Sequence, residues 1–187
     1  ATTAWDYATV RYNAAGETVW VRRFVGPFDD QPTAMALDSF GNVIVTGSTG
    51  VNETLSNYCT VKYSASGGML WTRTFSGVPD FGATAQAVGT DPDGNVYVTG
   101  QGTRPDWNVD MVTVKYSPAG DTLWTRWFDS PDRHDDVPRA MAVTGNAVYV
   151  AGSSYDRYVT VKYTPAGETT WARFYHGPGY GGSTTTI

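Results

Sequence analysis

The five-residue stretch VTVKY stands at residues 112–116 and again at 159–163, and near-copies stand at 8–12 (ATVRY) and 59–63 (CTVKY). The threonine of each copy, at positions 9, 60, 113 and 160, sets repeat intervals of 51, 53 and 47 residues. A tryptophan follows eleven residues after each threonine, at positions 20, 71, 124 and 171. The chain therefore consists of internal repeats with a period of about 50 residues. Such a period is typical of propellers and other repeat arrays.

Each repeat has four short runs that favour β-strands. In the second repeat we expect strands at 33–37, 43–46, 58–63 and 69–75, because these runs are rich in Val, Thr, Tyr and Trp. Turn sequences bound them, with DSFGN and DPDGN after first strands and NAAG, SASG, SPAG and TPAG after third strands. Four antiparallel strands per repeat predict an all-β fold, a β-propeller of four-stranded antiparallel blades.

The composition agrees with a β-protein and excludes some functions. Hydrophobic residues make up 41% of the 187 residues, charged residues only 17%, and glycine is abundant. The net charge of −5 provides no basic field, so we expect no nucleic-acid partner. No apolar run is long enough for a transmembrane helix, and we expect no membrane insertion.

The repeat also divides the chain into blades. We expect a single propeller segment over 1–187 with about 3.5 blades. The expected parts are two strands of a first blade (1–26), a second blade (32–75), a third blade (83–128), a fourth blade (139–176) and the start of a further blade (181–187). The chain begins without methionine, so we expect a processed protein or a piece of a longer one.

The partial first and last blades leave three alternatives open. The chain is a segment of a longer propeller, or it completes its split blade with copies of itself, or it closes alone as a distorted four-bladed ring. We expect completion by further blades of the same chain or by other copies, as a ring or an open filament. The strand edges expected to join are those of Tyr7, Thr9, Arg11, Ser183, Thr184, Thr185, Thr186 and Ile187.

The loops between second and third strands differ most from repeat to repeat: GSTGVNETLSN, GQGTRPDWNVD and GSSYDR. Variable loops on a repeated scaffold usually carry binding specificity. An exposed aromatic ring beside polar groups suits a glycan or a surface protein. The expected binding residues are Arg104, Asp106, Trp107, Tyr155, Asp156 and Arg157.

No pattern in the sequence singles out a catalytic or metal site. The aspartates between blades match no calcium-loop motif, and we expect solvated loops or carboxylates that cap strand-end amides. These aspartates are Asp29, Asp30, Asp80, Asp135 and Asp136. His134 and His176 lack companion ligands at metal-binding spacing. We therefore expect no catalytic residue, no metal and no cofactor.

The recurrent tryptophan and arginine of the fourth strand share one strand face, as Trp71 and Arg73 illustrate. Because the pair recurs in every repeat, a packing role between blades is favoured over ligand binding. We expect Trp71, Trp124 and Trp171 to pack between blades. Cys59 stands where Ala8 and its equivalents stand in the other repeats, so a small packed side chain is expected.

The phrases DxxTVKY, GxxxWxRxF and GNVYVTG resemble the SBBP repeat, a β-propeller repeat of secreted and surface proteins of bacteria and some archaea. The resemblance covers nearly the whole chain and implies an extracellular or cell-surface location. A propeller hosts unrelated activities, so the resemblance is weak on function. We expect a non-catalytic extracellular scaffold with structural or interaction roles. The alternative is part of a glycan-active or quinone-linked propeller enzyme, since the GxxxW phrase loosely resembles the tryptophan motif of quinoprotein propellers.

Overall fold

The computed structural model describes residues 5–177, and every regular element among them is a β-strand. The fourteen strands form one two-stranded sheet and three four-stranded sheets, all with antiparallel pairing. Each four-stranded sheet consists of four consecutive strands in chain order, which is the meander of a propeller blade. The prediction of an all-β fold built from four-stranded antiparallel blades is confirmed.

The blades are numbered along the chain, and their strands are named A to D in chain order. Blade 1 contributes only strands C and D, which are β1 (Tyr7–Tyr12) and β2 (Thr18–Phe24). Blade 2 consists of β3 (Asp30–Leu37), β4 (Val43–Gly50), β5 (Ser56–Tyr63) and β6 (Met69–Phe75). Blade 3 consists of β7 (Ala83–Thr90), β8 (Val96–Thr103), β9 (Val109–Tyr116) and β10 (Thr122–Phe128). Blade 4 consists of β11 (Asp136–Val143), β12 (Val148–Ser154), β13 (Arg157–Tyr163) and β14 (Thr169–Tyr175).

Some strands are longer than the sequence predicts. In blade 2 the fourth strand is as expected, but β3 begins at Asp30 and β4 continues to Gly50. Glycine and serine end a strand in most sequence patterns, whereas here Gly47 lies within the ladder. A Cβ at Gly47 would lie 2.0 Å from the carbonyl oxygen of Gln31, so only glycine permits this close pairing of β3 and β4. The start of a further blade expected at 181–187, including Ser183 to Ile187, lies outside the described residues.

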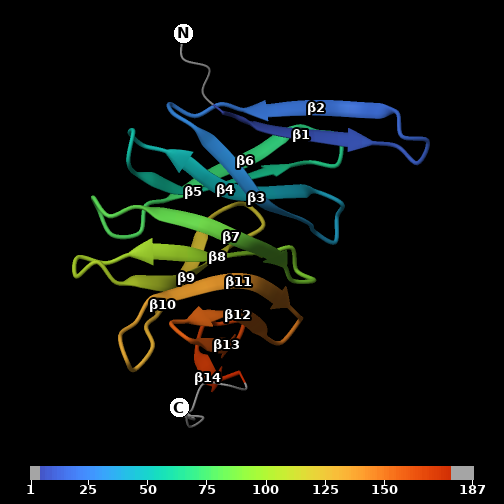
Figure 1. Cartoon of the computed structure of the whole chain (residues 1–187). Helices are drawn as coiled ribbons and strands as arrows, with labels where there is room; N and C mark the ends of the chain where they lie inside the picture. The colour runs from blue at the N-terminus through green and yellow to red at the C-terminus, as the bar shows by residue number, and fades with distance from the viewer. Residues whose placement is uncertain (1–4, 178–187) are drawn as a thin grey trace.

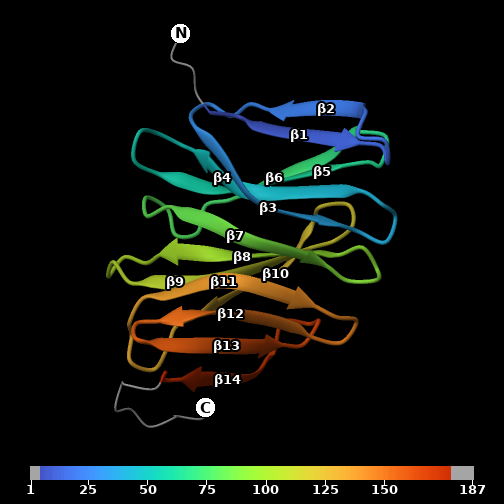
Figure 2. The same cartoon turned by 45° about the vertical axis from the view of Figure 1, so that its right-hand side comes forward.

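The four sheets are stacked one on another, with the A strands β3, β7 and β11 side by side (Figure 1). β1 and β14 lie at opposite ends of this stack (Figures 1 and 2). Residues 5–177 therefore have the arrangement of a propeller, but they do not close into a ring. Where two blades meet, one face of the first sheet packs against one face of the next sheet.

These two faces have different side chains, and alternation along the strands separates them. One face, here the valine face, presents the middle valine of strand C, such as Val114. The other, the tryptophan face, presents the recurrent Trp and Arg of strand D. Between blades 2 and 3, Ile44, Tyr58 and Trp71 of one blade pack against Val98 and Val114 of the next. The core thus consists of blade-to-blade layers, one per junction.

The tryptophan face also grips the C–D turn of the next blade through hydrogen bonds. Trp71 donates its Nε1–H to the carbonyl oxygen of Pro118 at 3.0 Å, and Lys62 donates from Nζ to the same oxygen at 3.4 Å. Arg73 donates its Nε–H to the carbonyl oxygen of Gly120 at 2.6 Å. We call this set the inter-blade latch.

The latch recurs at the other two junctions, which accounts for the repeated phrases in the sequence. Between blades 1 and 2, the donors Arg11 and Trp20 share the carbonyl of Ala65, and Arg22 binds that of Gly67. Between blades 3 and 4, the donors Lys115 and Trp124 share the carbonyl of Pro165 at 3.0 Å each, and Arg126 binds that of Gly167. The Lys or Arg of the TVKY phrase and the Trp of the next phrase therefore recur together because they bind one carbonyl.

The predicted packing of the tryptophans holds for two of the three. Trp71 and Trp124 are buried between blades. Trp171 is half-buried, and its ring lies 6.1 Å from that of Tyr149 in its own blade. It belongs to the last blade among the described residues, where no following turn covers it.

The turn glycine beneath each tryptophan provides a test of the latch. Gly120 has a φ of +90°, and a Cβ there would lie 2.9 Å from Cγ of Trp71. Gly16 holds the same place in blade 1 with a φ of +80°, but nothing lies within 4 Å of its Cβ position. We expect Gly16→Ala to lower the free energy of unfolding by about 1–2 kcal/mol through backbone strain alone. We expect Gly120→Ala to lower the free energy of unfolding by about 1–3 kcal/mol more, because its Cβ would also displace the ring of Trp71. Urea denaturation measures both, and equal losses would contradict the role of the ring contact.

A buried ion pair in blade 2 provides a second test, in acid. Lys62 Nζ lies 2.9 Å from Asp38 Oδ2, with side chains 2% and 0% exposed. Burial raises the pKa of Asp38, but hydrogen bonds from Lys62 and Asn42 outweigh it and hold the pKa below its usual value. The stability from this carboxylate is therefore present above a pH of about 4 and is lost as the pH falls through the lowered pKa.

We expect Lys62→Met to lower the free energy of unfolding at pH 7 by about 3–5 kcal/mol, because it leaves a buried carboxylate without its cation. It should also weaken the further loss of stability on acidification, because the pKa of Asp38 is no longer held low. Arg23→Met is the control, since Arg23 pairs with Asp6 at the surface and such a pair contributes about 0–1 kcal/mol. Urea unfolding at pH 7 and at about pH 2–3, below the usual carboxylate pKa of about 3.9, provides the measurement. A Lys62→Met variant as acid-sensitive as the parent would contradict the assignment.

Candidate binding surface

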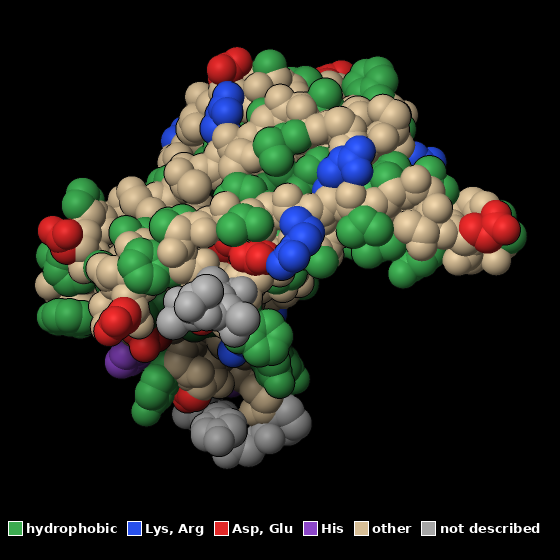
Figure 3. All heavy atoms as spheres, turned by 90° about the horizontal axis from the view of Figure 1, so that it is seen from above, with side chains coloured by type: hydrophobic (Ala, Val, Ile, Leu, Met, Phe, Trp, Pro, Cys, Tyr) green, Lys and Arg blue, Asp and Glu red, His purple; other side chains and the backbone are tan. Residues whose placement is uncertain are grey.

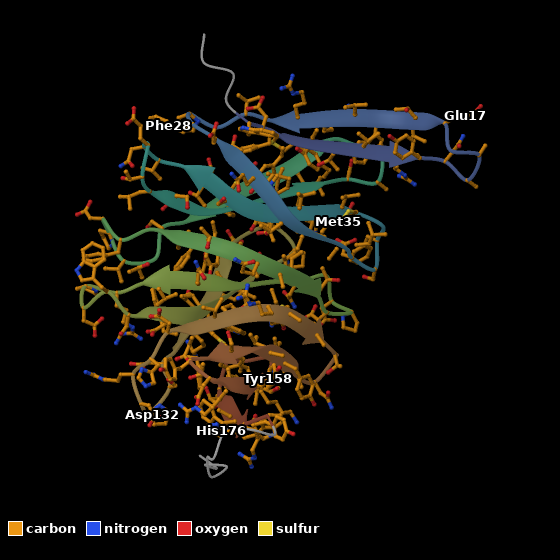
Figure 4. All side chains as sticks on the ribbon, viewed as in Figure 1. Glu17, Phe28, Met35, Asp132, Tyr158 and His176 are labelled. Carbon is orange, nitrogen blue, oxygen red and sulfur yellow. The ribbon has the colours of Figure 1, made fainter. Side chains whose placement is uncertain are left out.

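The B–C loops and the D–A connections lie on one side of the stack, at the left in Figures 1 and 2. The A–B and C–D turns lie on the opposite side. Figure 4 places Phe28 and Asp132 on the first side and Glu17, in the C–D turn of blade 1, on the other. We call the side with the B–C loops and D–A connections the rim.

Trp107 stands at the tip of the B–C loop of blade 3, and its side chain is 76% exposed. Its ring lies 5.3 Å from the ring of Phe81 in an edge-on arrangement. Phe81 comes from the connection between β6 and β7. The tip of the B–C loop of blade 3 and the D–A connection that leads into blade 3 thus meet through aromatic rings.

Blade 4 repeats this arrangement with different residues. Tyr155 and Asp156 alone separate β12 from β13, and Tyr155 is 74% exposed. Its ring stacks on His134 with centroids 4.6 Å apart. His134 comes from the connection between β10 and β11.

The D–A connections carry a ring at equivalent positions, namely Phe28, Phe81 and His134, each 53 residues after the one before. These three rings are not among the expected binding residues, although their constant spacing in the sequence is a usable signal. Rings at one place in successive connections make the rim an aromatic surface. The rings of Trp107 and Tyr155, which lie against Phe81 and His134, provide large, rigid contact areas for a partner.

Backbone strain collects on the same rim. The non-glycine residues with positive φ between 5 and 177 are Asp80, Trp107, Arg133 and Tyr155, and all four lie in B–C loops or D–A connections. The left-handed region costs an L-residue about 1–2 kcal/mol. Strain of this kind concentrates at functional sites, where the geometry of a side chain matters more than stability.

Two expected binding residues are engaged within the protein. Arg104 forms an ion pair with Asp110 and lies 5.0 Å over the ring of Trp127. Arg157 is buried, pairs with Asp132 at 2.5 Å and lies over the ring of Phe174. Their guanidinium groups hold the rim together, and Arg157 offers little surface to a partner.

The two expected aspartates remain at the surface. Asp106 is exposed, and its carboxylate accepts the backbone N–H of Asn108 at 3.4 Å within its own loop. Asp156 is also exposed, and its carboxylate lies 3.9 Å from Nδ1 of His176. Of the six expected residues, the rim therefore exposes Trp107, Tyr155 and these two aspartates most fully.

A groove of about 730 Å³ opens on the rim between blades 2 and 3. Its lining combines a ring with polar groups: Phe28, Asp29, Gln31, Ser48, Glu53 and Thr84. Its volume falls in the usual range for small-ligand sites. Asn52 shapes the B–C loop at its edge by accepting the backbone N–H of Thr54 and of Leu55 at 2.9 and 2.8 Å. None of these residues is among the expected binding residues.

The two ends of the stack are a second candidate surface. Blade 1 presents its valine face outward, and Val10 is 39% exposed, whereas Val61, Val114 and Val161 at the same repeat position are 0% exposed. Figure 3 looks down on this end and shows hydrophobic side chains spread over it. A groove of about 520 Å³ runs along β1 between Val10 and Met35.

Of the two expected joining edges, the described residues include that of β1. β1 pairs only with β2 among the described strands, so its other edge is open. The side chains of Tyr7 and Thr9 are buried against blade 2, while Arg11 is exposed. What is open along β1 is therefore a row of backbone N–H and C=O groups, and not the side chains of Tyr7 and Thr9.

Blade 4 presents its tryptophan face at the other end. Tyr158 is 67% exposed, whereas Tyr7, Tyr58 and Met111 at the same repeat position are buried. Tyr175 is exposed as well and stacks on Tyr158 with centroids 6.3 Å apart. Each end therefore exposes a face of the kind that the internal junctions bury.

The recurrence of one blade-to-blade junction agrees with the comparison with known families. Residues 19–53, from β2 to the B–C loop of blade 2, match the family model described as SBBP, β-propeller repeat. This match covers 35 of the 187 residues. The matched residues span strand D of one blade and strands A and B of the next, and they include the latch donors Trp20 and Arg22.

Two further proteins are similar to this chain. The chain is 30% identical over 116 residues to the "Uncharacterized WD repeat-containing protein L264" of Acanthamoeba polyphaga mimivirus, which is 49% of this chain and 8% of that protein. A crystal structure of a protein of unknown function from Bacteroides caccae superimposes with a TM-score of 0.56 and 16% identity, over 90% of this chain and 54% of that one. The chain thus spans less than a tenth of the curated relative and about half of the solved one. The second likeness is one of fold alone.

In residues 5–177 there is no helix with the length and apolar character needed to span a bilayer.

Trp107 allows a direct test of the rim. We expect Trp107→Ala to lower glycan-array or pull-down signal at least about tenfold, because truncating an aromatic anchor of an interface removes more than 1 kcal/mol. Stability should change by less than about 0.5 kcal/mol, because the ring is exposed. Glu17→Ala, on the opposite side, is the control. Binding that survives Trp107→Ala but is lost in Glu17→Ala would move the binding surface to the C–D turns.

Proposed function

We propose that this chain is a non-catalytic, extracellular or cell-surface β-propeller scaffold that takes further SBBP blades at its two ends and binds a partner at its rim. The observation that carries the proposal is the exposure at both ends of side chains that the three internal junctions bury. An extracellular place is supported by the resemblance to SBBP repeats of secreted and surface proteins. Glycans and surface proteins are the partners that the aromatic and acidic rim would suit.

The internal junctions specify what would cover each end. A tryptophan face is covered by the valine face and C–D turn of a following blade. Blade 1 offers both, since Gly16 with its positive φ completes a turn of the same form, closed by its N–H to the carbonyl of Asn13 at 3.0 Å. Blade 4 offers Trp171 and Lys162 at the latch positions. The natural occupant of either end is therefore another blade of the same kind.

Such a blade would come from another copy of the chain or from the same polypeptide. In the first case the contact is head-to-tail, because the two faces differ, and it builds a ring or an open filament. In the second case the outward faces of blades 1 and 4 stay uncovered, and able to bind other copies, when the 187-residue chain is studied alone. Both cases predict that the isolated chain self-associates.

Light scattering with size-exclusion chromatography tests this proposal. We expect the 187-residue chain to have a concentration-dependent mass above the 20.3 kDa of one copy. Val10→Asp should shift the mass towards one copy, because a charge would enter a face that is buried in every internal junction. Val19→Asp is the matched control, because Leu70 and Leu123 at its repeat position are 51% exposed even in blades with both neighbours. A parent chain that remains at 20.3 kDa at all concentrations would refute the proposal.

A further inference from the structure

Three aspartates meet where blade 3 joins blade 4. Asp110 lies in β9, Asp129 follows β10, and Asp136 begins β11. One carboxylate oxygen from each lies within 4.8 Å of the other two. The side-chain carboxylate of Asp135 accepts the backbone N–H of Val109 at 3.0 Å, which helps to hold Asp136 near Asp110.

Two of the three aspartates are buried, and each of the three has one buried oxygen without a hydrogen-bond partner. Asp110 and Asp136 are each 0% exposed. The Oδ1 atoms of Asp110, Asp129 and Asp136 are all buried, and none has a hydrogen-bond partner among the described residues. Buried polar atoms in folded proteins are nearly always satisfied, so three such oxygens at one point indicate a missing ligand.

Other oxygens surround Asp136. Ser130 donates its backbone N–H to Asp136 Oδ2 at 2.6 Å, and Ser154 pairs with Asp136 across the ladder of β11 and β12. Both serine side chains are buried. The lining of the cluster is thus carboxylate and hydroxyl oxygen, with no nitrogen or sulfur ligand.

The charges at this point are not balanced. Burial raises the pKa of Asp110 to about 6; the nearby Arg104 opposes this rise, and Asp129 and Asp136 add to it. Burial also raises the pKa of Asp136. Three carboxylates and one guanidinium leave two negative charges at this point, and an uncompensated charge is expensive where, as for Asp110 and Asp136, the carboxylate is buried.

The other junctions show that the fold does not need these carboxylates. The equivalent positions between blades 2 and 3 are Asn57, Ser76 and Ala83, and the Trp127 ring packs there, where a Cβ at Gly102 would meet it at 2.7 Å. Between blades 1 and 2 the equivalent of Asp136 is Asp30, which accepts the N–H of Gly26. Three carboxylates converge at one junction only within 5–177.

We propose that Asp110, Asp129 and Asp136 bind a calcium ion that joins blade 3 to blade 4. Calcium takes 6–8 oxygen ligands at about 2.3–2.6 Å, so opposed ligands lie up to about 5 Å apart, which accommodates three oxygens that all lie within 4.8 Å of one another. Magnesium needs about 2.0–2.1 Å and hence a tighter cluster. The hydroxyls of Ser130 and Ser154, together with water, would complete the ligand set. This proposal departs from the sequence-based expectation of no metal.

Calcium titration of the EDTA-dialysed 187-residue chain tests the proposal. With CaCl2 up to about 10 mM, we expect the melting temperature to rise by about 3–10 °C, given dissociation constants of about 0.1–1 mM. Isothermal titration calorimetry should give one ion per chain. The same concentration of MgCl2 should have a smaller effect.

Two variants locate the site. Asp129→Asn should abolish the calcium shift, yet in EDTA it should melt at or above the parent temperature, because it removes one of three like charges. Asp30→Asn, at the equivalent place in another junction, should keep the shift in full. No heat and no shift in the parent would overturn the proposal. So would a calcium shift that is as large in Asp129→Asn as in Asp30→Asn.

Discussion

One carbonyl oxygen in each C–D turn, accepting hydrogen bonds from two donors of the preceding blade, underlies the arrangement of the molecule. In the second junction this oxygen belongs to Pro118, and Trp71 and Lys62 donate to it. The turn must bring its glycine under the indole ring, which requires a positive φ and no side chain. The Lys, the Trp and the turn glycine therefore recur together, and the strands between them need only alternate correctly.

Much of this could be predicted from the sequence, and for a physical reason. Residues that pack between blades recur in every repeat, so Trp71 and Trp124 stand out by their constant distance from a threonine. Strand ends were less predictable. Gly47 looks like a turn residue, yet it lies inside a ladder because its partner strand approaches too closely for any side chain.

The rim residues and the three clustered aspartates are harder to predict from the sequence than the residues between blades. Their residues differ from blade to blade, so recurrence cannot identify them. Arg157 is an example: it stands in a short loop sequence that looks exposed, but a ring and a carboxylate from other elements cover it. Asp110, Asp129 and Asp136 come from three different elements, and only the register between blades brings them together. Phe28, Phe81 and His134 are an intermediate case, detectable by spacing but hidden by their differing chemistry.

The latch has a consequence for the history of the chain. Each set of donors binds the turn of the very next repeat and touches no other, so every junction is complete within two consecutive repeats. Removing or duplicating one whole repeat would join a tryptophan face to another valid valine face, and every latch would again have its acceptor. Gene segments of this kind can therefore lose or gain blades through recombination without a compensating mutation. A single aspartate cluster confined to one junction would then move with its pair of blades, as a separate trait of those two repeats.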